Sequence, residues 1–215
     1  MLKVNKKLEE INLEEDIVVV DKPKGWTSHD VVAKIRNELH TKVGHGGTLD
    51  PFATGVLLIL IGKATKRFDE IKNWDKEYVM EIELGKATDT GDRTGKVVER
   101  KKIDQELSFL EVESVVKSFK GEYMQEVPRY SAVKRRGRKL YHLAREGKLI
   151  KLPKRKVNIK QIELISLQGL SLKVRVVCGS GTYMRSLAVD IGKKLGLLAH
   201  AKELRRIRVG EYKLI

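Results

Sequence analysis

The longest apolar run of the chain covers residues 56–61, six aliphatic side chains in a row. A run of this length is typical of a buried strand and falls far short of the roughly 20 apolar residues that a membrane helix needs. The first 16 residues lack the apolar segment of a secretory signal. The single cysteine, Cys178, excludes an intramolecular disulfide framework and a zinc site built from several cysteines. Together these features predict a soluble protein of a reducing, cytoplasmic compartment.

Short strands and helices are expected to alternate irregularly. Residues 17–20 form a β-branched run, and residues 78–84 and 171–177 alternate between apolar and polar side chains, as strands do. Helices are expected to follow Thr27 or Ser28, to cover residues 104–119, and to follow a glycine turn at 179–183. In the helix at 104–119 we expect five buried residues: Leu107, Leu110, Val115, Val116 and Phe119. We expect residues 1–16 to form a loose arm or a short helix.

This order of elements predicts a mixed α/β (α+β) architecture with hairpin-like strand pairs rather than a doubly wound sheet. No stretch rich in Pro, Gly and Ser divides the chain, so we expect residues 1–215 to form one domain.

The positive charge is concentrated in two segments. Lys and Arg number 44 against 29 Asp and Glu, a net of +15. Residues 130–156 carry eleven basic residues and one acidic residue, and residues 193–213 carry seven and two. These two segments account for the whole excess, which indicates a binder of polyanions. The polarity of residues 130–156 predicts a projecting loop or hairpin there, although a solvated basic face would have the same composition.

Single residues are ambiguous when taken alone. Asp50 follows a glycine-rich loop at 44–49, where an acid is more often structural than catalytic. Tyr78 opens an alternating strand and could be a core aromatic residue. Arg185 follows a glycine turn at the expected start of a helix, where a cation is poorly placed unless it faces an anion. The loop with Asp89 and Asp92 lacks the spacing of a calcium site, and we interpret it as turn chemistry.

Several motifs taken together indicate the function more clearly than these single residues do. In chain order they are Asp21-Lys-Pro-Lys-Gly-Trp-Thr-Ser28, Gly44-His-Gly-Gly-Thr-Leu-Asp-Pro-Phe-Ala-Thr-Gly55, Lys76-Glu-Tyr78, Thr88-Asp-Thr-Gly-Asp92, Arg129-Tyr-Ser-Ala-Val-Lys134 and Gly181-Thr-Tyr-Met-Arg185. This set resembles the TruB family of tRNA pseudouridine synthases over residues 17–212. The resemblance implies the pseudouridine-synthase fold, a mostly antiparallel mixed sheet flanked by helices and carrying an RNA-binding insertion.

The resemblance also implies roles for individual residues. Asp50 would be the catalytic carboxylate, Tyr78 would stack on the target base and could transfer a proton, and Arg185 would pair with Asp50. The implied substrate-binding residues are His45, Tyr183, Leu204, Lys22, Lys134, Arg135, Arg136 and Arg138. Among these, Lys22 belongs to a motif that mainly supports the site. Residues 130–156 correspond to an RNA-clasping insertion.

The implied reaction is the isomerisation of uridine-55 in the T loop of tRNA, without a metal or an organic cofactor. We expect tRNA as the partner, a monomer, and neither a membrane nor an obligatory protein partner. Bacterial members usually continue into a C-terminal RNA-binding (PUA) domain, which we expect to be absent or vestigial here. Three alternatives stay open: a guide-RNA-directed synthase that shares the same core, a tRNA-folding chaperone without turnover, and a ribosomal-type basic binder.

Overall fold

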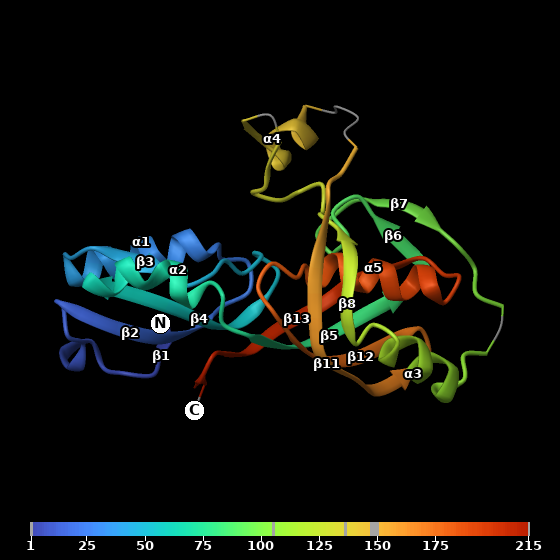
Figure 1. The fold of residues 1–215 in the computed structure, drawn as a ribbon, viewed down its shortest axis with the longest axis horizontal. Helices are drawn as coiled ribbons and strands as arrows, with labels where there is room; N and C mark the ends of the chain where they lie inside the picture. Colours follow the sequence, from blue (N-terminus) through green and yellow to red (C-terminus); the bar gives the residue numbers. More distant parts are fainter. Residues whose placement is uncertain (1, 105, 136, 147–150, 215) are drawn as a thin grey trace. The chain divides into compact units, whose positions relative to one another are not determined.

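The computed structural model describes residues 2–104, 106–135, 137–146 and 151–214 (Figure 1). The chain forms two compact units. The first comprises Met1–Val79, Val177–Ser180 and Glu203–Ile215, and the second comprises Met80–Val176 and Gly181–Lys202. Three strands contribute residues to both units: β5 (Lys76–Leu84), β12 (Ser171–Cys178) and β13 (Ala199–Val209).

The first unit is built around a long antiparallel pair. Strand β2 (Glu15–Lys22) runs beside β4 (Thr54–Gly62), with Glu15 opposite Gly62 and Lys22 opposite Gly55. The part of β13 that belongs to this unit lies parallel to β4, with Arg206 opposite Gly55. The remaining elements of the unit are β1 (Lys3–Val4), β3 (Val43–His45), β14 (Tyr212–Lys213), α1 (Ser28–Leu39), α2 (Phe68–Ile71) and two 3-10 turns, Leu8–Glu10 and Lys63–Arg67.

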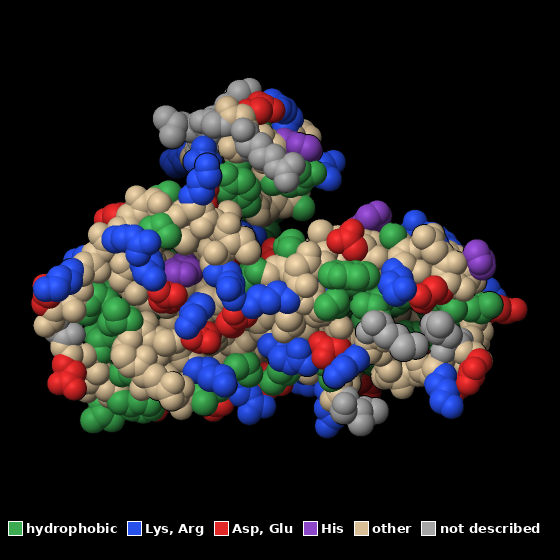
Figure 2. Space-filling view, turned by 180° about the vertical axis from the view of Figure 1, so that it is seen from behind, with side chains coloured by type: hydrophobic (Ala, Val, Ile, Leu, Met, Phe, Trp, Pro, Cys, Tyr) green, Lys and Arg blue, Asp and Glu red, His purple; other side chains and the backbone are tan. Residues whose placement is uncertain are grey.

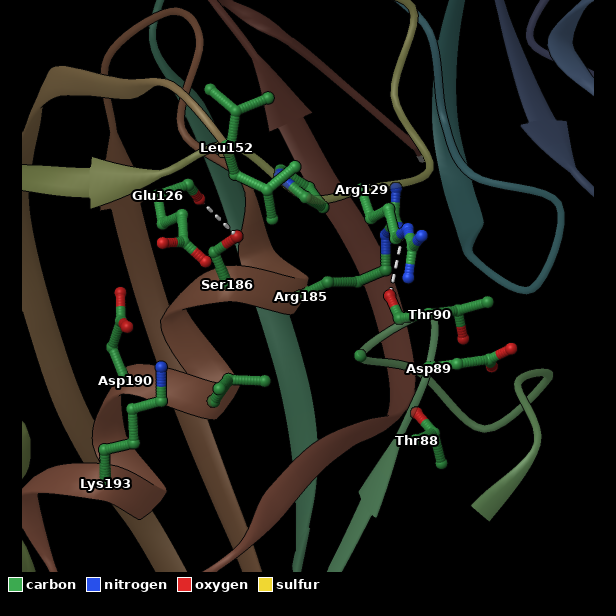
Figure 3. A pocket seen from close by; sticks show the side chains of 14 residues that line it. Thr88, Asp89, Thr90, Glu126, Arg129, Leu152, Arg185, Ser186, Asp190 and Lys193 are labelled. Carbon is green, nitrogen blue, oxygen red and sulfur yellow. Dashed lines mark hydrogen bonds between the residues drawn. The ribbon is translucent and has the colours of Figure 1, made fainter. Parts of the chain in front are cut away.

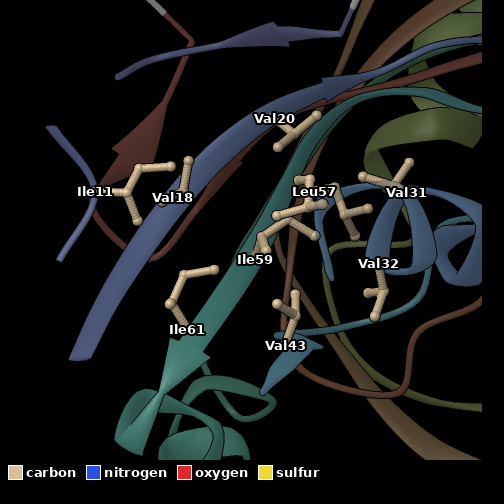
Figure 4. Close-up of a cluster of buried hydrophobic side chains, with 10 residues drawn as sticks. Ile11, Val18, Val20, Val31, Val32, Val43, Leu57, Ile59 and Ile61 are labelled. Atoms are coloured by element: carbon tan, nitrogen blue, oxygen red, sulfur yellow. The ribbon is translucent and has the colours of Figure 1, made fainter. Parts of the chain in front are cut away.

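Helix α1 covers one face of this pair (Figure 4). Thr27 caps the helix: its side chain accepts from the amide of Asp30, and the Asp30 carboxylate accepts from the amide of Thr27. Val31, Val32 and Ile35 are buried against the strands, in a cluster that also contains Val18, Val20, Leu57, Ile59 and Ile61. The predicted strands at 17–20 and 56–61 and the helix after Thr27 are therefore confirmed.

The second unit contains the rest of the sheet, with strands in the order β13, β5, β12, β11 and β8. Strands β11 (Lys154–Gln168) and β8 (Gly121–Glu126) are antiparallel, with Lys154 opposite Glu126. The unit also holds β6 (Lys86–Thr88), β7 (Val97–Arg100), β9 (Lys134–Arg135), β10 (Arg138–Lys139), α3 (Phe109–Lys117), α4 (Leu140–Arg145) and α5 (Met184–Lys194). The mixed, mostly antiparallel sheet with flanking helices is the predicted fold class.

The expected helix at 104–119 was wrong in its bounds, and of its five expected buried residues only Val116 is buried. Helix α3 begins after Ser108, and its buried residues are Val112 and Val116, whereas Leu110 is 73 % exposed. Val112 and Val116 are four residues apart and share one helix face, which turns Leu110 outward. Residues 3–4, expected in a loose arm or a helix, form β1 and pair with β2.

The basic segment 130–156 is partly a hairpin, as expected. Strands β9 and β10 pair antiparallel, and α4 follows them directly. The segment does not extend to residue 156 as a separate insertion, because residues 154–156 already belong to β11 and pair with β8. Arg136 lies outside the described residues. No helix in the described part of the chain is long and apolar enough to cross a membrane.

Candidate active site

Asp50 lies in the loop that joins β3 to β4 in the first unit, and it is half-buried. Backbone hydrogen bonds fix this loop at both ends: Gly46 donates to the carbonyl of Leu58 at 2.8 Å, and Ala53 donates to the carbonyl of Asp50 at 3.0 Å. Residue 46 has to be glycine, because a Cβ atom there would lie 2.6 Å from the Ile71 side chain. The glycine run of the sequence therefore serves close packing of the loop on the unit.

A side-chain hydroxyl holds the residue next to Asp50. The Ser28 hydroxyl accepts from the amide of Leu49 at 2.9 Å and lies 3.3 Å from the carbonyl of the same residue. Ser28 and Leu49 are both buried. The first turn of α1 thus positions the backbone of the Asp50 loop.

Lys22 supports the loop from the other side of Asp50. It is fully buried, and its Nζ donates to the carbonyls of Trp26 at 2.7 Å, Pro23 at 2.9 Å and Pro51 at 3.3 Å. Burial lowers the pKa of Lys22 to about 8, against the opposing influence of the Asp50 charge. The amine therefore stays mostly protonated at neutral pH. The structure places this predicted substrate-binding residue under the loop, in the supporting position that its motif implies.

Arg206 is the residue of this site that sequence reasoning missed. Its side chain is almost fully buried, and Nε donates to the carbonyl of Val56 at 2.7 Å. Nη2 donates to the carbonyl of Gly47 at 3.0 Å, and Nη1 lies 3.4 Å from the carbonyl of Thr48. The sequence interpretation counted Arg206 with the basic segment 193–213. Its alternation with Leu204, on the same inward face of β13, was the signal for burial.

Tyr78 lies at the start of β5 and is 8 % exposed. Burial raises the pKa of Tyr78, and the nearby positive charge of Arg206 opposes that rise without outweighing it. The phenol is therefore neutral in the resting protein. It is better suited to stack or to donate a hydrogen bond than to act as a base.

Two further predicted residues belong to the same unit. His45, the last residue of β3, is half-buried, and its Nδ1 accepts from the amide of Gly47 at 3.3 Å. Burial, followed by the charge of Arg206, lowers the pKa of His45, so the ring is neutral at pH 7 with its proton on Nε2. Leu204 is buried on β13.

Arg185 and Tyr183 belong to the second unit. Arg185 is buried in the first turn of α5, and Nη1 donates to the carbonyl of Thr90 at 2.9 Å. Nη2 donates to the carbonyl of Tyr130 at 3.0 Å. Asp92 supplies an anion within this unit, as the position of Arg185 led us to expect. The pairing of Arg185 with Asp50 stays a prediction.

Tyr183 precedes α5 and is held through its backbone. The Gln125 side chain accepts from the Tyr183 amide at 2.8 Å and donates to the Tyr183 carbonyl at 3.1 Å. Gln125 is fully buried in β8. This pair of bonds fixes the turn from which Arg185 enters the unit.

Figure 3 shows a pocket of about 230 Å³ in the second unit, bordered by α5 and by the loop after β6. Arg129, Arg185 and Lys193 line it, together with the acids Asp89, Glu126 and Asp190. Burial raises the pKa of Asp190. Acids and bases mix in this pocket, so it lacks the one-sided charge of a phosphate site.

Several basic side chains lie on the surface around α4, at the top of Figure 2. Lys134, Arg138 and Lys139 are exposed there. Arg138 makes an ion pair with Glu146, and the side chain of Lys139 lies over the ring of Tyr141, with Nζ 5.6 Å from the ring centre. The Arg135 side chain and the whole of Arg136 lie outside what the structure describes. In the described residues, no three His, Cys, Asp or Glu side chains gather as metal ligands would.

Comparison with known proteins decides the family. The model of the TruB family pseudouridylate synthase, N-terminal domain, matches residues 34–184, and that of the tRNA pseudouridylate synthase B C-terminal domain matches residues 185–214. This chain belongs to the TruB family. Its loop with Asp50, its Tyr78 strand and its Arg185 turn all fall within the first match or at the junction of the two.

Two curated TruB relatives are named tRNA pseudouridine synthase B. The protein of Shouchella clausii is 46 % identical over 202 residues, covering 91 % of this chain and 67 % of the relative. The protein of Thermotoga maritima is 47 % identical over 201 residues, covering 93 % of this chain and 64 % of the relative. The chain thus spans about two thirds of the length of these relatives.

Two solved structures with the same fold are chains of larger assemblies. A chain in the crystal structure of a Cbf5-Nop10-Gar1 complex is 34 % identical, with a TM-score of 0.72, covering 94 % of this chain and 51 % of its own length. A chain in the structure of an H/ACA RNP bound to a substrate RNA is 29 % identical, with a TM-score of 0.68, covering 100 % of this chain and 59 % of its own length. The TruB core is therefore shared with these complexes.

Proposed function

We propose that the protein isomerises uridine-55 in the T loop of tRNA to pseudouridine. The N1–C1′ bond of the nucleotide breaks, the base turns, and C5 bonds to C1′. The proton lost from C5 is balanced by the proton gained at N1, so the reaction needs no oxidant or reductant.

Asp50 is the acting group in this proposal. A carboxylate can add to the reacting carbon or stabilise positive charge that develops on the sugar. The loop around Asp50 is held by Lys22, Arg206 and Ser28, and such a rigid mounting favours catalysis because little reorganisation is needed during the reaction. The neutral phenol of Tyr78 stacks on the target base.

The observation that carries the proposal is the identity of 46–47 % with relatives named tRNA pseudouridine synthase B. The identity with chains of the Cbf5 and H/ACA assemblies is lower, at 34 % and 29 %. This difference favours tRNA over a guide-RNA-directed substrate. We further propose that the protein acts in the cytoplasm as a monomer, without an obligatory protein partner.

The exposed basic residues around α4 are proposed to grip the RNA. The target base has to leave its stack, which costs a few kcal/mol, and phosphate contacts made by Lys134 and its neighbours offset that loss.

The deciding experiment incubates the purified protein with unmodified tRNA transcript and maps pseudouridine chemically. We expect product at position 55 from the wild type. Asp50→Asn is expected to abolish turnover and to leave tRNA binding within about tenfold of wild type, because Asp50 contributes little to the phosphate grip. Asp69→Asn, which changes an exposed acid of the same unit, is the matched control and should match wild type.

Several results would reject this function. Turnover by Asp50→Asn above a few per cent of wild type would remove Asp50 from the chemistry. Product formed only when guide RNA and partner proteins are added would select the guide-directed alternative. Tight tRNA binding without product from any tRNA would select the chaperone.

A further inference from the structure

Arg206 carries a buried charge whose hydrogen bonds go to backbone carbonyls. In the described chain it makes no ion pair with a carboxylate, and its guanidinium is instead directed at the carbonyls of Gly47, Thr48 and Val56. Gly47 and Thr48 precede Asp50 in the loop, and Val56 lies in β4 beyond it. One side chain therefore contacts the chain on both sides of Asp50.

The same guanidinium also lies close enough to Tyr78 for its charge to act on the pKa of the phenol. Asp50 and Tyr78 lie on different elements, a loop and the start of β5, and the sequence separates them by 28 positions. Arg206 thus binds the loop of the carboxylate and lies close to Tyr78.

We propose that Arg206 is a positioning residue of the reaction, which holds the Asp50 loop and the Tyr78 ring in one fixed relative geometry. This inference rests on the proposed function, because it assigns Arg206 an effect on turnover. It deepens that function by naming a residue that acts through Asp50 and Tyr78.

The chemistry of arginine suits this role. A guanidinium presents five N–H donors in a rigid plane, whereas a lysine ammonium presents three donors on one atom. Three carbonyls in different directions, bound by Nε, Nη1 and Nη2, match the planar guanidinium and not the single nitrogen of an ammonium. The charge also matters, since hydrogen bonds from an ionised donor are roughly twice as strong as neutral ones.

The backbone of Arg206 is fixed as tightly as its side chain. Arg206 lies opposite Gly55 in the parallel pairing of β13 with β4. Gly55 has a φ of +101°, and a Cβ atom there would lie 2.1 Å from the carbonyl oxygen of Arg206. Only glycine permits this approach. The strand pairing therefore holds the backbone of Arg206 in place, and the side chain extends from it toward the loop.

The neighbouring Arg205 provides a matched control. It lies on the same strand with its side chain exposed, and its Nη2 donates to the Asp21 carboxylate at 2.8 Å. Substitutions at 205 and 206 therefore make the same chemical change one residue apart, on opposite faces of β13.

The experiment compares Arg206→Lys and Arg206→Gln with Arg205→Lys and Arg205→Gln. Single-turnover rates with unmodified tRNA give the chemical step, filter binding gives the tRNA dissociation constant, and thermal unfolding shows that each protein is folded at the assay temperature. We expect both Arg206 variants to lose about 100-fold in rate, the scale of a 1 Å misplacement. Their dissociation constants should stay within about threefold of wild type, and both Arg205 variants should keep the wild-type rate.

A second readout separates positioning from simple support of the fold. The charge of Arg206 is one cause of the lowered pKa of His45, after burial. An NMR titration should show the pKa of His45 moving up toward its ordinary value in Arg206→Gln and staying unchanged in Arg205→Gln.

Each contrary result has a distinct meaning. A wild type that forms no pseudouridine overturns the proposed function and the positioning role together. An active wild type with an equally fast Arg206→Lys overturns the positioning role alone. Equal losses of rate and affinity, or failure of both Arg206 variants to fold at any temperature, would also overturn it, because Arg206 would then be a residue of RNA binding or of the fold.

Discussion

Nε of Arg185 lies 3.6 Å from Oδ2 of Asp92, and each side chain is 6 % exposed. The other carboxylate oxygen, Oδ1, accepts from the Thr94 amide at 2.9 Å and from the Thr90 hydroxyl at 3.0 Å. The loop that the sequence suggested was only turn chemistry therefore holds a buried counter-ion for the arginine of the second unit.

Removing the charge of Asp92 should destabilise the protein. Asp92→Asn leaves the Arg185 guanidinium buried beside a neutral amide, and breaking a buried pair in this way costs about 3 kcal/mol. Urea unfolding measures the loss. Asp89→Asn is the control from the same loop: its Oδ1 accepts from the Lys96 amide at 2.8 Å, and the loss there should be about 1 kcal/mol. Equal losses in the two variants would contradict a special role for the buried pair.

Arg185→Lys should harm catalysis more than binding. The guanidinium donates to the carbonyls of Thr90 and Tyr130 in addition to its pair with Asp92, and an ammonium cannot replace that planar set of donors. Single-turnover kinetics and filter binding, measured side by side, test this. A variant with normal turnover and lost affinity would make Arg185 an RNA contact instead.

The buried lysines of the first unit predict how stability depends on pH. Burial, with help from the charge of Arg206, lowers the pKa of Lys76 to about 8. Between pH 8 and pH 10 the unfolded chain therefore binds more protons at this residue than the folded chain, and stability rises with pH. In Lys76→Met this rise should be smaller, by up to about 1.4 kcal/mol per pH unit.

Urea unfolding at pH 8, 9 and 10 provides the check. Lys72→Met removes an exposed lysine of the same unit and should keep the wild-type slope. A Lys76→Met protein whose slope equals that of wild type would show that its ammonium is not desolvated.

The basic residues of segment 130–156 should control the salt dependence of tRNA binding. Each phosphate contact adds about 0.7 to the log–log slope for single-stranded RNA. Neutralising four residues together should flatten the slope by roughly two to three units; they are Lys134, Arg135, Arg136 and Arg138. The ion pair of Arg138 with Glu146 favours the lower end of that range.

Turnover at saturating tRNA should change less than affinity in this quadruple variant. The matched control neutralises four exposed lysines of the first unit, which are Lys3, Lys7, Lys63 and Lys66. Parallel titration lines for the wild type and the quadruple variant would reduce the region around α4 to a solvated face.

The spacing of apolar residues within each segment predicted most of the helices and strands, because that spacing decides which side of the segment is buried. The strand at 56–61 and the helix after Thr27 needed no information from distant residues. The prediction of a helix at 104–119 failed because that stretch has apolar residues on more than one side of the helix, so its own periodicity does not decide which side is buried. The packing of α3 against β11 selects Val112 and Val116, and that choice is made by a strand some 40 residues away.

The site assignments of Asp50 and Tyr78 stay predictions, each carried by one motif; the structure adds the loop and the strand on which they lie. Arg206 and Asp92 were missed because charged side chains are mostly exposed, and composition places them on the surface by default. Their burial depends on carbonyls and donors from other segments, such as Gly47 and Val56 for Arg206. Such partners are brought together only by the tertiary fold.

The parallel pairing of β13 with β4 sets an order of events during synthesis of the protein. Thr54 and its partner Arg205 are separated by 151 positions, so at about 5–20 residues per second the ribosome needs on the order of 8–30 s between them. Until then Thr54 and Gly55, at the start of β4, lack their partner strand, and the Asp50 loop lacks the guanidinium of Arg206. The nascent chain therefore carries an incompletely supported Asp50 loop until Arg206 has been synthesised.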